Sequence, residues 1–218
     1  MKITWLGHAA FLILSENGQK ILTDPYEAGS YGGALAYQPI NEEADIVTVS
    51  HQHADHYHPK GLKGQPEIIT GSGVRTVGGF SFKGISTFHD PSEGTQRGDN
   101  TVFVFTVDDI TLCHLGDLGH ALSEDQTAEI GDVDVVLVPV GGLYTIDSNE
   151  ATEIINTMAP KIVIPMHYKT SKCGFDIAGV DDFLRGKENV ERITGSEISL
   201  TKADLPRETH IKVLEHKL

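Results

Sequence analysis

The stretch Ser50-His51-Gln52-His53-Ala54-Asp55-His56 places three imidazoles and a carboxylate within seven residues. It follows Ala44–Val49, an apolar and β-branched run that predicts a buried strand. Open α/β sheets bind ligands at the carboxyl ends of their strands, which is where this loop begins. Imidazole nitrogens with one carboxylate oxygen suit zinc, manganese or iron. The first two histidines alternate and point the same way, whereas the aspartate and the third histidine follow a turn, so one loop could serve two metal ions.

Length and composition limit the number of domains, the location and the disulfide content that we expect of the protein. A chain of 218 residues can bury a core and is short enough for one domain, which we expect to span 1–218. Its apolar runs are too short to cross a bilayer, and Met1–Trp5 enters a strand pattern without a signal peptide. We therefore expect a cytoplasmic protein with no membrane partner. Cys113 and Cys173 are too few for a disulfide framework.

The charge balance bears on the partners. The formal net charge of −14 comes from 31 acidic and 17 basic residues, and it would repel a phosphate backbone. We therefore expect no nucleic-acid partner and disfavour a general nuclease. A small-molecule substrate is expected instead, and an anionic one stays open because two metal ions would add about four positive charges. The sequence does not decide the oligomeric state, so a homo-oligomer also stays open.

Apolar runs and turn signals predict mostly strands early and alternating helices later, which indicates an α/β fold with two mixed sheets and helices outside. Asn17-Gly18 is expected to form a hairpin turn with two positive φ angles. Expected strands are Lys2–Trp5, Ala9–Leu14, Lys20–Thr23, Ala44–Val49, Glu67–Thr70, Gly79–Phe88, Thr101–Val107, Ile110–Leu115, Val133–Val140 and Lys161–Pro165. Expected helices are Ser123–Ile130, Asp147–Met158 and Asp181–Arg185.

Four predicted strands end in a side chain that can bind a metal ion, namely in the loop His51–His56, at His89, at Asp117 and at His167. Chance histidines on polar loops are the alternative, but randomly placed residues would rarely follow this design four times. In its order, this set resembles the signature of the metallo-β-lactamase superfamily. The matching residues extend from Asp24 to His167. Together they are a specific signature of the superfamily, although each residue alone is weak evidence.

The resemblance implies a four-layer αββα sandwich of the metallo-β-lactamase type, with two divalent metal ions, zinc first and manganese or iron as alternatives. It further implies that His51, His53 and His89 hold one ion, that Asp55, His56 and His167 hold the other, and that Asp117 bridges both. Asp24 matches an early aspartate of the superfamily, which would orient a histidine by accepting its distal N–H. A plain turn residue before Pro25 is the equal alternative for Asp24.

Further motifs resemble one branch of the superfamily. Trp5-Leu6-Gly7-His8, Leu22-Thr23-Asp24-Pro25 and Ile164-Pro165-Met166-His167-Tyr168 are similar to uncharacterised metal-dependent hydrolases related to ascorbate-6-phosphate lactonases and phospholipase D-type enzymes. The chain departs from its relatives at Leu118, where threonine is frequent. It also lacks the large insertions of the nuclease and glyoxalase branches.

Several side chains outside the ligand set are ambiguous. His8 could reach the site from its early strand, but we expect a structural core histidine there, as at His114. His58 could be structural or functional. Arg97 in the loop after His89 could meet an anionic substrate group or remain solvated. His120 lies three residues beyond the predicted bridging aspartate, so we expect it at the rim of the metal pocket as a general acid.

These residues predict a binuclear metal-dependent hydrolase in which a metal-bridging hydroxide attacks a small-molecule ester, lactone or phosphodiester. The candidate catalytic residues are Asp55 and His120. No Gly-x-Ser-x-Gly motif or loop cysteine offers another nucleophile. A diiron oxidoreductase is an alternative, although that branch usually carries a glutamate ligand and a flavin domain. A non-catalytic metal-dependent binding or sensing module is a second alternative, which the complete ligand set disfavours.

Overall fold

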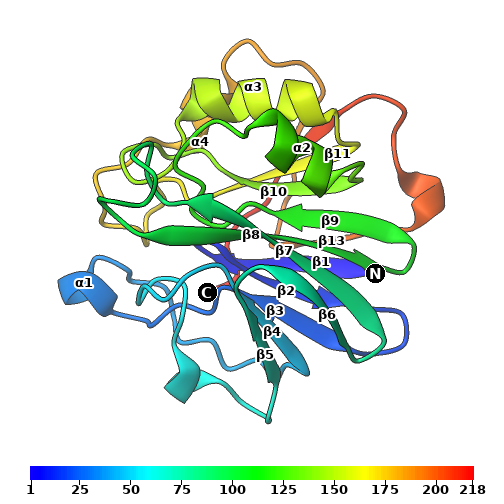
Figure 1. Cartoon of the computed structure of the whole chain (residues 1–218). Coiled ribbons are helices and arrows are strands. Elements are labelled where there is room, and N and C mark those ends of the chain that lie inside the picture. Colours follow the sequence, from blue (N-terminus) through cyan, green and yellow to red (C-terminus); the bar gives the residue numbers. More distant parts are fainter.

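The computed structural model describes all residues from 1 to 218 and contains two β-sheets packed face to face (Figure 1). The strands are β1 (Lys2–Gly7), β2 (Ala10–Leu14), β3 (Lys20–Thr23), β4 (Ile46–Val49), β5 (Glu67–Thr70), β6 (Gly73–Val77), β7 (Phe80–Phe88), β8 (Asp99–Val107), β9 (Ile110–His114), β10 (Val135–Pro139), β11 (Ile162–Met166), β12 (Val190–Arg192), β13 (Glu197–Ser199) and β14 (His210–Val213). One sheet has the order β13-β1-β2-β3-β4-β5 and the other β12-β14-β11-β10-β9-β8-β7-β6.

Both sheets mix parallel and antiparallel pairs. The early hairpin β1–β2–β3 is antiparallel, and β4 and β5 then add in parallel. In the second sheet β6 to β9 form an antiparallel meander, whereas β10, β11 and β14 run parallel to their neighbours. The predicted α/β class with two mixed sheets is confirmed.

Helices cover the outer face of the eight-stranded sheet (Figure 1). These are α2 (Glu124–Ile130), α3 (Ser148–Met158) and α4 (Val180–Leu184). Ser123 and Asp147 cap α2 and α3 through reciprocal capping boxes, which explains why the helices begin there. At 11 residues α3 is the longest helix, and none is long and apolar enough to span a membrane.

The outer face of the six-stranded sheet is covered by loops. Tyr26, Leu35 and Tyr37 from the segment after β3 share an apolar cluster with Leu22 and Val47 of the sheet. The only helix there is the single turn α1 (Ser30–Gly33), in which Tyr31 and Gly32 have positive φ angles. The sandwich therefore has helices on one side and a glycine-rich loop on the other. Glycine has a low helix propensity, so this loop does not extend α1 beyond a single turn.

The main core lies between the sheets and beneath the helices. It contains 45 buried residues. Successive residues of a strand face opposite sides of the sheet, so in β3 Ile21 belongs to this core and Leu22 to the apolar cluster on the outer face. All five residues of β10 are buried, as expected for a central strand covered on both faces. The remaining elements are two single 3-10 turns, η1 (Pro59–Gly61) and η2 (Lys202–Asp204).

The β2–β3 turn differs from expectation. At the β2–β3 connection Gly18 has a φ of 90°, but Asn17 is not in the positive region, so the predicted pair of positive φ angles is wrong. The Ser15 N–H donates to the Gln19 carbonyl across three loop residues, a length that needs only one left-handed residue. The pair of positive φ angles occurs instead at Asp108 and Asp109, 50° and 61°, between β8 and β9.

Candidate metal centre

The predicted ligands come together from four strand ends. The His51–His56 loop follows β4, His89 follows β7, Asp117 follows β9, and His167 directly follows β11. The two sheets are joined at this point, because the Thr101 N–H of β8 donates to the Ser50 carbonyl at 2.9 Å. The rule that ligands bind at the carboxyl ends of strands therefore predicted the location.

The Asp117 carboxylate lies at the meeting point of four imidazoles. Its Oδ2 atom is closest to an Nε2 atom in each case, at 3.0 Å from His56, 3.2 Å from His89, 3.4 Å from His167 and 3.8 Å from His51. Asp117 is 1 % exposed. Asp117 therefore lies between the two predicted ligand sets, which is the position that a residue bridging two metal ions would need.

The side chains form two groups around Asp117. In each group the potential ligand atoms lie within 4.8 Å of one another. The first group is His51, His53 and His89, and the second is His8, Asp55, His56 and His167. All seven residues predicted as ligands are thus brought together. The two groups contain the two ligand sets that the resemblance implies, with His8 added to the second, and a third group of His51, His56 and Asp117 connects them.

His8 joins the second group, although it was expected to be a structural core histidine. It is fully buried, and its Nε2 atom lies 3.2 Å from Asp55 Oδ2. Its ring centroid is 4.1 Å from that of His167, and its Nδ1 atom has no hydrogen-bond partner. The position after Gly7, at the end of β1, was the one available signal.

The donor atoms of the centre suit divalent metal ions. His51 Nε2, His56 Nε2 and Asp117 Oδ1 are buried without a hydrogen-bond partner. Burying such atoms unpaired is costly, and neutral imidazole with carboxylate oxygen is the ligand chemistry of zinc, manganese and iron. The residues present therefore fit the two metal ions that the motif implies.

The comparisons with known proteins agree with this centre. Residues 2–167 match the family model described as the β-lactamase superfamily domain. The chain belongs to this superfamily. A metal-dependent hydrolase of Carboxydothermus hydrogenoformans is 34% identical over 196 residues, which cover 78% of this chain and 85% of that protein. One from Thermococcus kodakarensis is 30% identical over 195 residues, with the same coverage of each chain.

Solved structures of the superfamily share the fold. A proposed Zn-dependent hydrolase of the metallo-β-lactamase superfamily from Thermotoga maritima is 43% identical and covers 99% of both chains, with a TM-score of 0.81. A metallo hydrolase of Ignicoccus hospitalis is 21% identical, covers 98% of this chain and 94% of its own, and has a TM-score of 0.66. The second likeness concerns the fold alone.

Asp24 and Ser50 connect the superfamily ligands to the sheet. Asp24 Oδ2 accepts from His56 Nδ1 at 2.8 Å and from the Ser50 hydroxyl at 2.6 Å, and Asp24 Oδ1 accepts from the Ser50 N–H. Ser50 Oγ also lies 2.9 Å from His51 Nδ1. Of the two roles considered for Asp24, the geometry thus favours the orienting carboxylate, which leaves His56 Nε2 free to face Asp117. Ser50 was not singled out from the sequence.

Burial controls the protonation of the histidines. It lowers the pKa of His51 to about 3 and that of His8 to about 4, so both imidazoles are neutral at physiological pH. Burial also acts to lower the pKa of His56, but the charges of Asp117 and Asp55 outweigh it and raise the pKa well above the usual value. In the metal-free protein, the carboxylates of Asp117 and Asp55 therefore favour the protonated form of His56.

Asn100 and two glycines hold the Asp117 loop in place. Asn100 Oδ1 accepts the Asp117 N–H at 3.0 Å, while its amide donates to Thr87 Oγ1 and to the Leu115 carbonyl. A Cβ atom on Gly116 would lie 2.4 Å from Asn100 Oδ1, and one on Gly119 would lie 2.3 Å from the His89 carbonyl carbon. The turn after β9 therefore needs these glycines for close packing.

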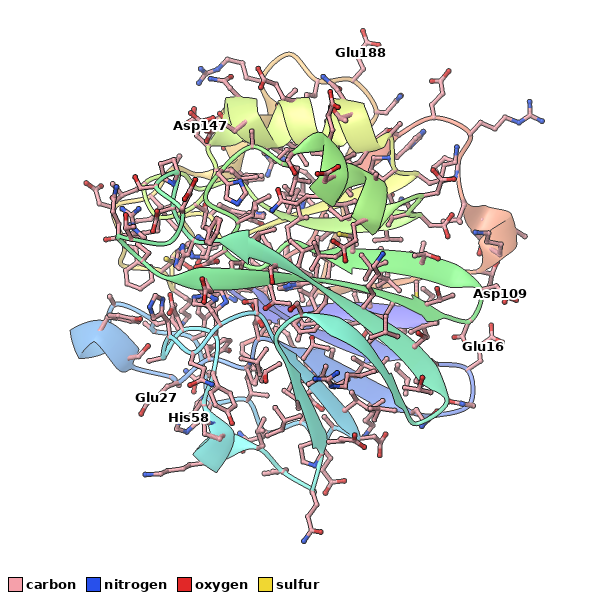
Figure 2. The ribbon with its side chains drawn as sticks, viewed as in Figure 1. Glu16, Glu27, His58, Asp109, Asp147 and Glu188 are labelled. Atoms are coloured by element: carbon pink, nitrogen blue, oxygen red, sulfur yellow. The ribbon has the colours of Figure 1, made fainter.

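His120 and His58 lie outside the two groups of potential ligands. Both ring nitrogens of His120 bond to backbone, since Nδ1 lies 2.7 Å from the Ala121 carbonyl and Nε2 accepts the Phe88 N–H at 3.1 Å. His120 is not among the residues that line the metal cavity, so the structure does not place it at the predicted rim. His58 Nδ1 lies 3.9 Å from Glu27, and Figure 2 shows both side chains on loops near the lower edge.

A cavity of about 380 Å³ opens over the centre. His53, Asp55, His89, Asp117 and His167 form its base, and the other lining residues are Tyr31, Arg97, Tyr144 and Phe175. Of these four, the sequence singled out Arg97 as a possible substrate contact. Tyr31 lies in the glycine- and tyrosine-rich loop Glu27–Gln38, which the sequence suggests could either overhang a site or be a plain surface connection. The three aromatic residues are far apart in the chain, so no local pattern connects them.

Proposed function

We propose that this protein is a metal-dependent hydrolase that acts on a small-molecule ester, lactone or phosphodiester. The observation that carries the proposal is the convergence of two ligand groups on one buried carboxylate, Asp117, beneath an open cavity. The relatives named as metal-dependent hydrolases support it. They leave the substrate class open, because one fold and metal centre serve many reactions.

The proposed metal ligands follow the two groups. His51, His53 and His89 would hold one ion, Asp55, His56 and His167 the other, and Asp117 would contact both. When bound, two such ions supply Lewis acidity and a reactive water at neutral pH. Zinc is the first choice for this mixture of imidazole and carboxylate, with manganese and iron as alternatives.

The protein orients Asp55 from both sides. The Tyr31 hydroxyl donates to Asp55 Oδ1 at 3.0 Å, and His8 Nε2 lies 3.2 Å from Asp55 Oδ2. Asp55 also lines the cavity, so its carboxylate can accept a proton from water at the base of the cavity. We therefore assign the proton-accepting role to Asp55 and give His120 none.

Hydrolysis assays with metal-free and metal-reconstituted protein test this function. The panel comprises matched aryl carboxyl esters, lactones and aryl phosphodiesters, with zinc, manganese and iron added in turn. We expect hydrolysis of at least one class only after reconstitution, and its loss in Asp117→Ala. Metal-loaded protein inactive on all three classes would favour the binding or sensing module.

A further inference from the structure

Aromatic side chains form one wall of the cavity above the metal centre. Phe175 lies between Tyr31 and Tyr144, with ring centroids 5.3 Å and 5.8 Å apart and interplanar angles of 75° and 71°. Tyr31 and Tyr144 are nevertheless 52% and 37% exposed. Exposed rings at a concave site offer apolar contact to a ligand, so this wall suits a flat or apolar group.

Arg97 stands at the edge of this wall without an anionic partner. Arg185 and Arg192 both pair with aspartates, whereas the Arg97 guanidinium donates only to the Leu143 carbonyl, at 3.2 Å, and forms no ion pair. Its guanidinium carbon lies 5.6 Å from the centre of the Tyr144 ring. A guanidinium has five N–H donors in a planar fork, so most of them are available to a carboxylate or phosphate in the cavity.

Asp90 fixes the loop that carries Arg97. Its carboxylate accepts four backbone N–H groups, among them that of Arg97 at 2.7 Å; the others belong to Ser92, Gly94 and Gln96. Asp90 directly follows the proposed ligand His89, so the loop is anchored beside the metal centre. Arg97 is therefore held in position before any ligand arrives, which lowers the entropic cost of binding.

A second cavity, of about 410 Å³, lies next to Arg97 and His53. Its lining includes Gln52, Thr70 and Thr101, and only one of its ten residues is hydrophobic. Arg97 and His53 line both cavities. The two cavities therefore adjoin at Arg97 and at the proposed ligand His53, and one has an aromatic wall whereas the other is mostly polar.

We propose that the substrate joins an apolar, ring-sized group to a hydrophilic group across the bond that is cleaved, and that it carries a negative charge bound by Arg97. This inference rests on the proposed function and names its substrate class. Water gives its oxygen to the acyl or phosphoryl centre and a proton to the leaving oxygen, so no other reactant is required. The charge belongs either to a phosphodiester or to a carboxylate elsewhere on the substrate.

Calorimetric binding to metal-reconstituted protein tests the proposal with four probes. Phenylphosphonate and 3-phenylpropanoate carry a ring and a charge, methylphosphonate lacks the ring, and 3-phenylpropanamide lacks the charge. We expect at least one ring-bearing anion to bind about tenfold more tightly than its matched probe, because it uses both the wall and the guanidinium. The ring-bearing anion that binds more tightly identifies the source of the charge.

Two variants and a control assign the effect to residues. Arg97→Gln should weaken binding of the preferred anion about tenfold or more and leave the amide unchanged. Phe175→Ala should remove the preference for the ring. Arg207→Gln is the control, because Arg207 is exposed, outside both cavities and without an ion pair, and it should bind as the unaltered protein does.

Metal analysis of the same samples separates this inference from the proposed function. Protein that retains no metal after reconstitution contradicts the proposed function. If metal-loaded Arg97→Gln protein binds both ring-bearing anions as tightly as the unaltered protein does, the inference is overturned and the proposed function is unaffected. Equal binding of phenylphosphonate and methylphosphonate, together with no preference for 3-phenylpropanoate over its amide, overturns the inference as well.

Discussion

His8, Asp24 and His167 hold backbone conformations that side chains rarely adopt, with φ angles of 51°, 39° and 50°. Each such residue costs roughly 1–2 kcal/mol relative to an ordinary conformation. Neighbouring contacts hold the strain in place: the His8 carbonyl accepts the Trp5 indole N–H at 2.9 Å and the His167 N–H at 3.2 Å. The strain lies at the candidate centre because these turns aim the side chains inward from strand ends.

His8 provides the first prediction at this scale. Replacing it with alanine should weaken metal binding at the second group by about 10- to 100-fold, because Asp55 loses one of its two side-chain contacts and the group loses a potential ligand. Titration of metal-free protein with zinc, followed by calorimetry, measures the change. Unaltered affinity at both sites would return His8 to a purely structural role.

His120 provides the second prediction, which now differs from the sequence-based expectation. With both ring nitrogens bonded to backbone atoms, His120→Ala should lower the free energy of unfolding by about 1–2 kcal/mol and leave metal content unchanged. Denaturant unfolding and elemental analysis measure the two quantities. A loss of about 10²-fold in kcat/KM at unchanged stability would restore the general-acid hypothesis.

At the scale of elements, the turn after β9 is the most constrained segment of the centre. Gly119→Ala should displace the His89 backbone, lower stability by about 1–3 kcal/mol and weaken metal binding, since the added Cβ has no room. Gly179→Ala is the matched control, because a Cβ there meets nothing within 4 Å. Thermal unfolding with and without zinc compares them, and equal behaviour of the two variants would contradict the packing argument.

Elements were predictable where the local pattern is strong. The ligand loops could be found because each follows an apolar strand, and the start of α3 was visible because Asp147 and Glu150 have the spacing of a capping box. β6 was missed because four of its five residues are exposed, which removes the alternation that marks a strand. The aromatic wall of Tyr31, Tyr144 and Phe175 was missed because only the tertiary fold brings these residues together.

At the scale of the whole molecule, charge predicts the behaviour toward nucleic acids. With a net charge of −14, the protein should bind random duplex DNA or RNA weakly or not at all at physiological salt. Gel-shift titration over a range of salt concentrations measures this. Tight, salt-sensitive binding would revive the nuclease hypothesis and show that bound metal ions or a local basic surface outweigh the overall charge.

The central claim is that the residues around Asp117 form a binuclear metal centre, and metal stoichiometry tests it most directly. Elemental analysis of protein reconstituted with zinc and freed of excess metal should give about two ions per chain. Asp117→Ala should bind markedly less, because Asp117 Oδ2 lies within 3.4 Å of His56, His89 and His167. A content near zero in the unaltered protein, or full content in the Asp117 variant, would contradict the account.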